Sequence, residues 1–145
     1  PQAIKYYLIK GAEKPLSVAD NYYLGLAYYY NDEDLKADSV FVKVLEVTPD
    51  YAPGWMMRAR IGNRLDTAEA KLYLPMVPYE NYVKYASGDK EKNKKNLLES
   101  YKYLAWYWVQ NDDNAKAKSY FEEILLLDPA NQEAIDNLKL LKEQR

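Results

Sequence analysis

The sequence predicts an all-α protein made of repeated helical hairpins, and three observations carry this prediction. Matching residues recur at a shift of 34 positions, a period typical of helix–turn–helix repeats. Short polar turns at 32–34 and 111–114 separate apolar stretches, and their side chains are suited to capping helix ends. Small residues recur within the apolar stretches, which allows paired helices to approach closely. The matched pairs are Ala3 and Ala37, Tyr7 and Phe41, Pro15 and Pro49, Asn21 and Trp55, and Gly25 and Ala59.

Eight helices are expected, and prolines set several of their ends. Pro49 and Pro129 each follow a helix, because a proline blocks its continuation. Pro75 and Pro78 must lie at or before the first turn of the fifth helix, and residues 65–75 form an irregular or short helical insertion before it. The last helix alternates apolar and charged residues, as expected of a helix that caps an array. The expected helices span residues 2–12, 18–30, 34–47, 52–64, 76–86, 92–110, 113–127 and 131–144.

Two stretches of the chain resemble the tetratricopeptide repeat family. The first comprises residues 21–28 followed by Ala37, Phe41, Val44 and Pro49. The second comprises Tyr101, Leu104, Ala105, Trp108, Ala117, Phe121, Ile124 and Pro129. The resemblance implies a right-handed α–α superhelix of about three helix–turn–helix repeats with a C-terminal capping helix. It divides a single array fragment, 1–145, into the second half of a repeat (1–17), a repeat (18–51), a degenerate repeat with an insertion (52–90), a repeat (91–130) and the capping helix (131–145).

The degenerate repeat begins with Trp55, Ala59 and Ile61 and then departs from the family pattern. Arg58 stands where the family has leucine, and Gly62 stands where it has an aromatic residue. Either this repeat packs differently around the insertion, or Arg58 is buried with an acidic partner. We favour the first alternative.

Composition argues against catalysis and against a nucleic-acid partner. The chain has no histidine and no cysteine, which removes thiol nucleophiles, histidine proton shuttles and the usual zinc ligands. Glu122 and Glu123 are adjacent on a helix and point apart, and no glycine-rich phosphate loop occurs. The net charge of −2 gives no field for nucleic acid, and the mixed charges at 89–95 indicate a solvated loop and helix start. No enzyme activity, cofactor or metal site is predicted.

The resemblance also implies a concave groove for a partner protein or peptide, lined by the first helix of each repeat. Helical spacing places these residues on common stripes, and aromatic residues, Met and Arg are enriched in binding hot spots. The alternative is that the aromatic residues only pack against neighbouring helices. The predicted groove residues are Tyr22, Leu26, Tyr29, Tyr30, Met56, Arg60, Asn63, Arg64, Lys102, Trp106 and Val109.

Arg60, Arg64 and Lys102 suggest either a patch for a ligand carboxylate or pairing with local acids. Pairing is favoured, with Asp66, Glu69 and Glu99 as the expected partners. One specialised branch of the family grips the carboxylate tail of chaperones with Lys, Asn and Arg. That mode is disfavoured, because the matching positions hold Tyr22, Leu26, Met57, Glu99 and Tyr103.

The leading functional hypothesis is a non-catalytic scaffold that binds a partner segment in the groove. The alternative is a structural end-piece of a longer solenoid that mediates self-assembly or docks in a membrane-associated complex. A third is an accessory domain that binds carboxylates or serves an enzyme. The chain opens at Pro1 within a repeat, so we expect a longer protein with any signal peptide upstream. The composition resembles that of tetratricopeptide repeat proteins of Bacteroidetes. Several of these are exported, which favours the periplasm while leaving the compartment open.

Overall fold

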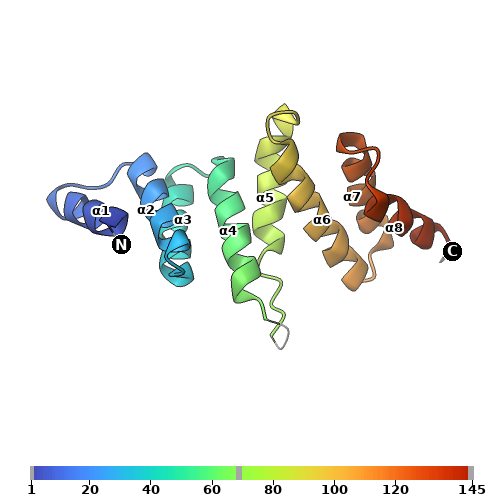
Figure 1. The fold of residues 1–145 in the computed structure, drawn as a ribbon, viewed down its shortest axis with the longest axis horizontal. Helices are drawn as coiled ribbons and strands as arrows, with labels where there is room; N and C mark the ends of the chain where they lie inside the picture. Colours follow the sequence, from blue (N-terminus) through green and yellow to red (C-terminus); the bar gives the residue numbers. More distant parts are fainter. Residues whose placement is uncertain (1, 68–69, 144–145) are drawn as a thin grey trace. The chain divides into compact units, whose positions relative to one another are not determined.

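The computed structural model describes residues 2–67 and 70–143, and these residues form helices without any strand (Figure 1). The all-α prediction is therefore confirmed. The helices are α1 (Gln2–Glu13), α2 (Val18–Tyr30), α3 (Asp34–Val47), α4 (Ala52–Leu65), α5 (Met76–Ala86), the short 3-10 helix η1 (Ser87–Asp89), α6 (Lys94–Gln110), α7 (Asn114–Leu127) and α8 (Gln132–Glu143). None of the described helices combines the length and apolar character needed to cross a bilayer.

Helix ends follow the expected local chemistry closely. The expected bounds 18–30, 34–47 and 76–86 coincide with α2, α3 and α5. The Ser17 side chain caps α2 by accepting a hydrogen bond from the backbone N–H of Asp20. The Asp20 carboxylate in turn accepts a hydrogen bond from the backbone N–H of Ser17. Helix α6 starts two residues later than expected, because the carboxylate of Asp89 accepts the N–H of Lys92 and holds a turn there.

The chain forms two compact units, the first ending at Pro78 and the second beginning at Tyr79. In the first unit α2 and α3 form a hairpin, with α1 packed on α2 and α4 packed on α3. Gly25 faces the buried ring of Phe41, and a Cβ atom at Gly25 would lie 2.8 Å from the ring's Cζ atom. Glycine therefore permits the close approach of α2 and α3. The buried core cluster of this unit comprises Ile4, Leu24, Tyr28, Ala37, Val40, Phe41, Met57 and Ile61.

The second unit repeats the same hairpin in α6 and α7, followed by α8. Asp32 and Asp112 both have a φ angle of 57°, so the two turns correspond at an offset of 112 − 32 = 80 residues. In each turn the next residue donates its N–H to a carbonyl of the preceding helix at 3.0 Å, Glu33 to Tyr28 and Asp113 to Trp108. The recurrence of these backbone bonds shows that the two hairpins are copies of one structural unit. The predicted repeat boundaries remain a prediction.

Both alternatives for the degenerate repeat hold in part. The insertion does pack on α4, since a Cβ atom at Gly62 would lie 3.0 Å from the backbone nitrogen of Pro75. The Asp66 carboxylate also accepts the N–H groups of Leu72 and Leu74. Arg58, however, has the acidic partner that we disfavoured. Its Nε atom lies 2.7 Å from Oδ1 of Asp38, with both side chains half-buried.

Candidate functional site

Four tyrosines on α2 form two braced ring pairs in the first unit. Tyr22 and Tyr23 meet edge to face with 5.9 Å between ring centroids, and Tyr29 and Tyr30 do so at 5.3 Å. In each pair the first ring packs against the core cluster, while the second is open to solvent: Tyr23 is 55% exposed and Tyr30 77%. Tyr22, Tyr29 and the half-buried Leu26 therefore do pack on the core, whereas Tyr30 does not.

Tyr22 also contacts the rings of Phe41 and Tyr51, with centroid distances of 5.6 and 5.4 Å. Its burial raises the pKa of its phenol, the Tyr51 phenol adds to this rise, and Arg60 on α4 opposes it. The phenol is thus protonated at neutral pH. The structure thus brings Arg60 on α4 within the electrostatic reach of Tyr22 on α2.

Arg64 on α4 covers the second tyrosine pair. Its guanidinium carbon lies 3.7 Å from the centroid of the Tyr29 ring, and Nη1 donates to the Tyr29 carbonyl oxygen at 3.0 Å. Nη1 also contacts the carboxylates of Asp34 at 3.0 Å and Asp32 at 3.4 Å. Local pairing is therefore correct for Arg64, but its acids come from the α2–α3 turn. Of the expected acids, Asp66 holds the insertion and Glu69 lies outside the described residues.

We call this part of the first unit the tyrosine–arginine surface, comprising Tyr22, Tyr23, Leu26, Tyr29, Tyr30, Arg60 and Arg64. Tyr23 was missed by the sequence reasoning, although it lies seven residues before Tyr30 and therefore two helical turns away on the same stripe. Met56 requires a correction. Its side chain is 2% exposed, so we remove it from the surface that a partner could contact. Asn63 is exposed on α4.

The predicted residues of the second unit lie on α6. Trp106 is 37% exposed and its ring packs beside Tyr103, with 5.5 Å between centroids. Lys102 is exposed and pairs with Glu133 on α8 at 3.0 Å, while Val109 is half-buried. Glu99, the acid expected near Lys102, instead accepts a hydrogen bond from the Tyr79 hydroxyl at 3.1 Å.

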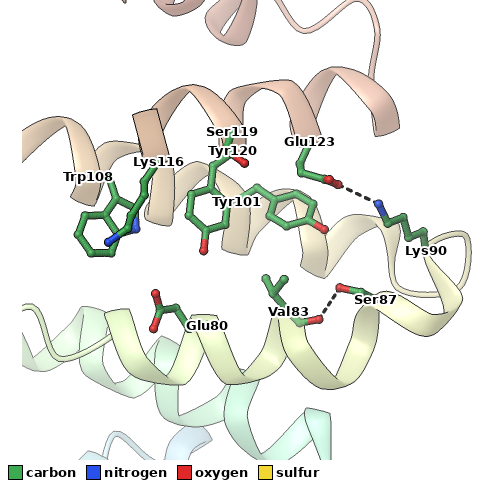
Figure 2. Close-up of a pocket in the computed structure, with 10 residues that line it drawn as sticks. All are labelled: Glu80, Val83, Ser87, Lys90, Tyr101, Trp108, Lys116, Ser119, Tyr120 and Glu123. Atoms are coloured by element: carbon green, nitrogen blue, oxygen red, sulfur yellow. Dashed lines mark hydrogen bonds and ion pairs between the residues drawn. The ribbon is translucent and has the colours of Figure 1, made fainter. Parts of the chain in front are cut away.

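A pocket of about 520 Å³ opens elsewhere in the second unit, between α5 and α7 with α6 as its floor (Figure 2). The centroids of the Tyr101 and Tyr120 rings lie 6.0 Å apart, and the Nζ atom of Lys90 lies 2.8 Å from a carboxylate oxygen of Glu123. Burial raises the pKa of both phenols, so both stay protonated at neutral pH. The pocket is lined by Glu80, Val83, Ser87, Lys90, Tyr101, Trp108, Lys116, Ser119, Tyr120 and Glu123.

Sequence reasoning missed this pocket, because the stripe of Tyr101 and Trp108 on α6 reads as ordinary core. The one available signal lies in the comparison of the two hairpins. At the offset of 80 residues, Tyr101 and Tyr120 stand where the first hairpin has Asn21 and Val40.

No family model and no curated protein matches the chain. A solved structure does: the C-terminal part of a TPR repeat-containing protein from Cytophaga hutchinsonii, with 38% sequence identity and a TM-score of 0.81. The match covers 93% of this chain and 52% of that one, so the chain spans about half the length of the solved protein. In fold and sequence the chain is therefore similar to a tetratricopeptide repeat protein. The solved protein comes from a member of the Bacteroidetes, which agrees with the expected likeness to proteins of that group.

The similarity to a tetratricopeptide repeat protein supports the general role of a protein-interaction scaffold, and folds of this type are typically non-catalytic. It also relates the two predicted surfaces. Tyr22, Leu26 and Tyr29 on α2 correspond to Lys102, Trp106 and Val109 on α6 at the offset of 80 residues. The first helix of each repeat therefore presents equivalent positions in both units, with different chemistry.

Proposed function

We propose that this tetratricopeptide repeat array binds a segment of a partner protein on the tyrosine–arginine surface and performs no catalysis. The observation that carries the proposal is the bracing of the exposed rings. Tyr23 and Tyr30 each lie edge to face on a neighbouring ring, with Tyr22 and Tyr29 packed on the core. A braced ring loses little conformational freedom when a partner covers it, which favours binding.

The charges of the surface support a mixed aromatic and polar contact. Arg64 is held by its stacking on Tyr29 and by Asp34, so its guanidinium is fixed before a partner arrives. Because Asp32 and Asp34 offset much of that charge, the surface does not favour a strongly acidic ligand. An extended or helical segment with apolar side chains fits these features best. We extend the proposal to Lys102, Trp106 and Val109 as the equivalent contact surface of the second unit.

The test is partner capture from the native cell, with paired tyrosine variants. Tyr23→Ser together with Tyr30→Ser removes both exposed rings and leaves the core-facing rings in place. We expect this variant to lose the captured protein while its helicity stays unchanged. The control is Leu126→Ser, since Leu126 on α7 is 71% exposed and belongs to neither proposed surface. Unchanged capture by the double variant would refute the proposal. Trp106→Ala tests the second surface in the same way.

Self-association is a second candidate, favoured by one observation on α1. Tyr6, Leu8 and Ile9 are each more than half exposed, which is a large apolar area for one helix. On this reading α1 docks on another tetratricopeptide repeat surface, such as a second copy. Sedimentation velocity over a wide concentration range tests it. A concentration-dependent species that disappears on Ile9→Lys supports self-association, and a monomer throughout excludes it.

A further inference from the structure

The pocket of the second unit lies on a different side of α6 from the predicted groove. Trp106 belongs to the groove stripe and Trp108 to the pocket, and the two residues are separated by about 200° around the helix axis. The pocket is therefore separate from the proposed partner surface. Either one could fail without the other.

Part of the pocket wall is a standard feature of the hairpin. Lys116 lies over the Trp108 ring, 3.7 Å from its centroid, and pairs with Asp113 at 3.4 Å. The first hairpin has the same arrangement, with Lys36 over the Tyr28 ring at 5.6 Å and paired with Glu33. Because this arrangement occurs in both units, it belongs to the repeat. It does not account for a pocket that is found in the second unit.

The rest of the wall is particular to the second unit. Tyr101, Tyr120 and Glu123 replace Asn21, Val40 and Lys43 of the first hairpin, and the offset is 80 residues in each case (101 − 21, 120 − 40 and 123 − 43). These replacements add two aromatic rings and exchange a positive charge for a negative one. Glu80 on α5 adds a further carboxylate, which Figure 2 shows pointing into the pocket on the side of Trp108 and Tyr120.

Among the charged residues that line the pocket, Glu80 is the one without an ion-pair partner among the described residues. Lys90 is paired with Glu123, and Lys116 is paired with Asp113. Glu80 forms no hydrogen bond or ion pair with any described residue, although its side chain is half-buried. The lining holds two carboxylates, Glu80 and Glu123, and two lysines, but Lys90 is engaged by Glu123 and Lys116 by Asp113 outside the lining, so the Glu80 carboxylate is left without a paired cation. A partly desolvated carboxylate without a partner favours a cation.

The aromatic walls favour the same kind of ligand. The faces of Tyr and Trp rings attract cations, and the Trp108 face already holds the ammonium of Lys116. The Tyr120 ring is near enough to Glu80 for that carboxylate to raise the pKa of the Tyr120 phenol, after the larger effect of burial. A volume of about 520 Å³ is ample for one long side chain. Negative charge, aromatic faces and space therefore coincide in one pocket.

We propose that this pocket binds the cationic side chain of a partner protein, a lysine ammonium or an arginine guanidinium, with Glu80 as its counter-ion and Tyr120 as its aromatic wall. The cation enters between α5 and α7, and its alkyl stem lies against Val83 and the Tyr120 ring. The contact is salt-sensitive, because a half-exposed ion pair is screened by dissolved ions.

The test uses short peptides and NMR. The probes are acetyl-Gly-Lys-Gly-amide and acetyl-Gly-Arg-Gly-amide, with acetyl-Gly-Gln-Gly-amide as the neutral control. The indole N–H of Trp108 is a suitable reporter, since it is buried without a hydrogen-bond partner among the described residues. Trp55 of the first unit serves as the internal reference. We expect saturable shifts of the Trp108 signal with one or both cationic peptides, and the stronger of the two identifies the preferred cation.

Two variants decide whether the pocket causes the binding. Glu80→Gln keeps the shape of the side chain and removes no described contact, and it should weaken binding by about two- to fivefold. The control Glu122→Gln makes the same charge change on α7 outside the pocket, and it should bind like the unmodified chain. Tyr120→Leu should also weaken binding, because it removes the aromatic face.

Equal shifts with the glutamine peptide would overturn the proposal. So would unchanged affinity in Glu80→Gln, or the absence of any Trp108 shift with either cationic peptide. A circular dichroism melt of each variant shows whether it is folded. If Glu80→Gln proves unfolded, Tyr120→Leu carries the decision alone. Capture of a whole partner on the tyrosine–arginine surface has no bearing on any of these outcomes.

Discussion

The same substitution, glycine to alanine, should have opposite effects at two helical positions of the first unit. At Gly25, a new Cβ atom would lie 2.8, 2.9 and 3.1 Å from three atoms of the Phe41 ring. Carbon atoms in contact normally lie about 3.5–4.0 Å apart. The Phe41 ring is 0% exposed and cannot move into solvent. Overpacking of this kind costs about 1–3 kcal/mol.

Alanine also has a better helix propensity than glycine, by about 1 kcal/mol. The net expectation for Gly25→Ala is a loss of about 1 kcal/mol of folding free energy. Gly11 in α1 has more room, because its new Cβ atom would lie 3.3 Å from Cγ of Leu16, whose side chain is half-exposed and able to shift. Gly11→Ala should therefore stabilise the chain by about 0.5 kcal/mol, since the position is near the helix end.

Thermal unfolding followed by circular dichroism measures both effects. For a chain of this length, 1 kcal/mol corresponds to a change in Tm of about 2–4 °C. Gly25→Ala should lower Tm, and Gly11→Ala should raise it slightly. The double variant Gly25→Ala with Phe41→Leu has a smaller side chain opposite the new methyl group. It should therefore lose less stability than the sum of the losses measured for the two single variants. If Gly25→Ala and Gly11→Ala both raise Tm, the space around the new Cβ atom does not determine the effect, and the prediction is refuted.

Three further outcomes follow from contacts described above. A double-mutant cycle of Arg58→Met and Asp38→Asn, measured by urea unfolding, should give a coupling energy of about 0.5–1 kcal/mol, and a value of zero would show the half-buried pair to be inert. The hydrogen bond from Lys10 lowers the pKa of the Asp20 carboxyl in the folded state. At pH values above the ordinary pKa of an aspartate, the ionised carboxylate therefore stabilises the folded state, and this contribution is lost as the pH falls through the folded-state pKa. The unmodified chain should then lose more stability than Asp20→Asn when thermal melts are taken from about pH 5 down to about pH 3; parallel losses would contradict this. Leu104→Ala, at a site that is 0% exposed, should cost about 2–5 kcal/mol in urea unfolding, and a loss below about 1 kcal/mol would mean that the α6–α7 core collapses around the gap.

Local chemistry explains why the helices were predictable. The Ser17 cap, the turn at Asp32 and the proline at position 78 act over a few residues, and α2, α3 and α5 begin and end where these signals place them. The all-α class followed from the same signals together with the recurring small residues. Each of these depends on neighbours in sequence, which are visible without a structure.

The site was less predictable, because helical periodicity places a side chain on a stripe without saying what covers it. Met56 lies on the expected stripe and is nevertheless buried. Arg64 was expected to pair with a nearby acid such as Asp66 or Glu69, but its acids Asp32 and Asp34 lie 32 and 30 residues away along the chain. The pocket near Glu80 depends on how α5 and α7 pack beside α6, which no repeat period encodes. Long-range packing decided all of these cases.

The lysine, aromatic and acidic groups at each hairpin turn have a consequence for the order of folding. In both copies the three side chains lie within nine residues, 28–36 and 108–116 (36 − 28 + 1 and 116 − 108 + 1). Contacts this close in sequence close small loops and form early, so nucleation can begin at either hairpin. Pairs such as Arg58 with Asp38 and Tyr79 with Glu99, each 20 residues apart, must wait for a neighbouring helix to arrive. Pulse-labelled hydrogen exchange should therefore show the α2–α3 and α6–α7 amides protected before those of α4 and α5.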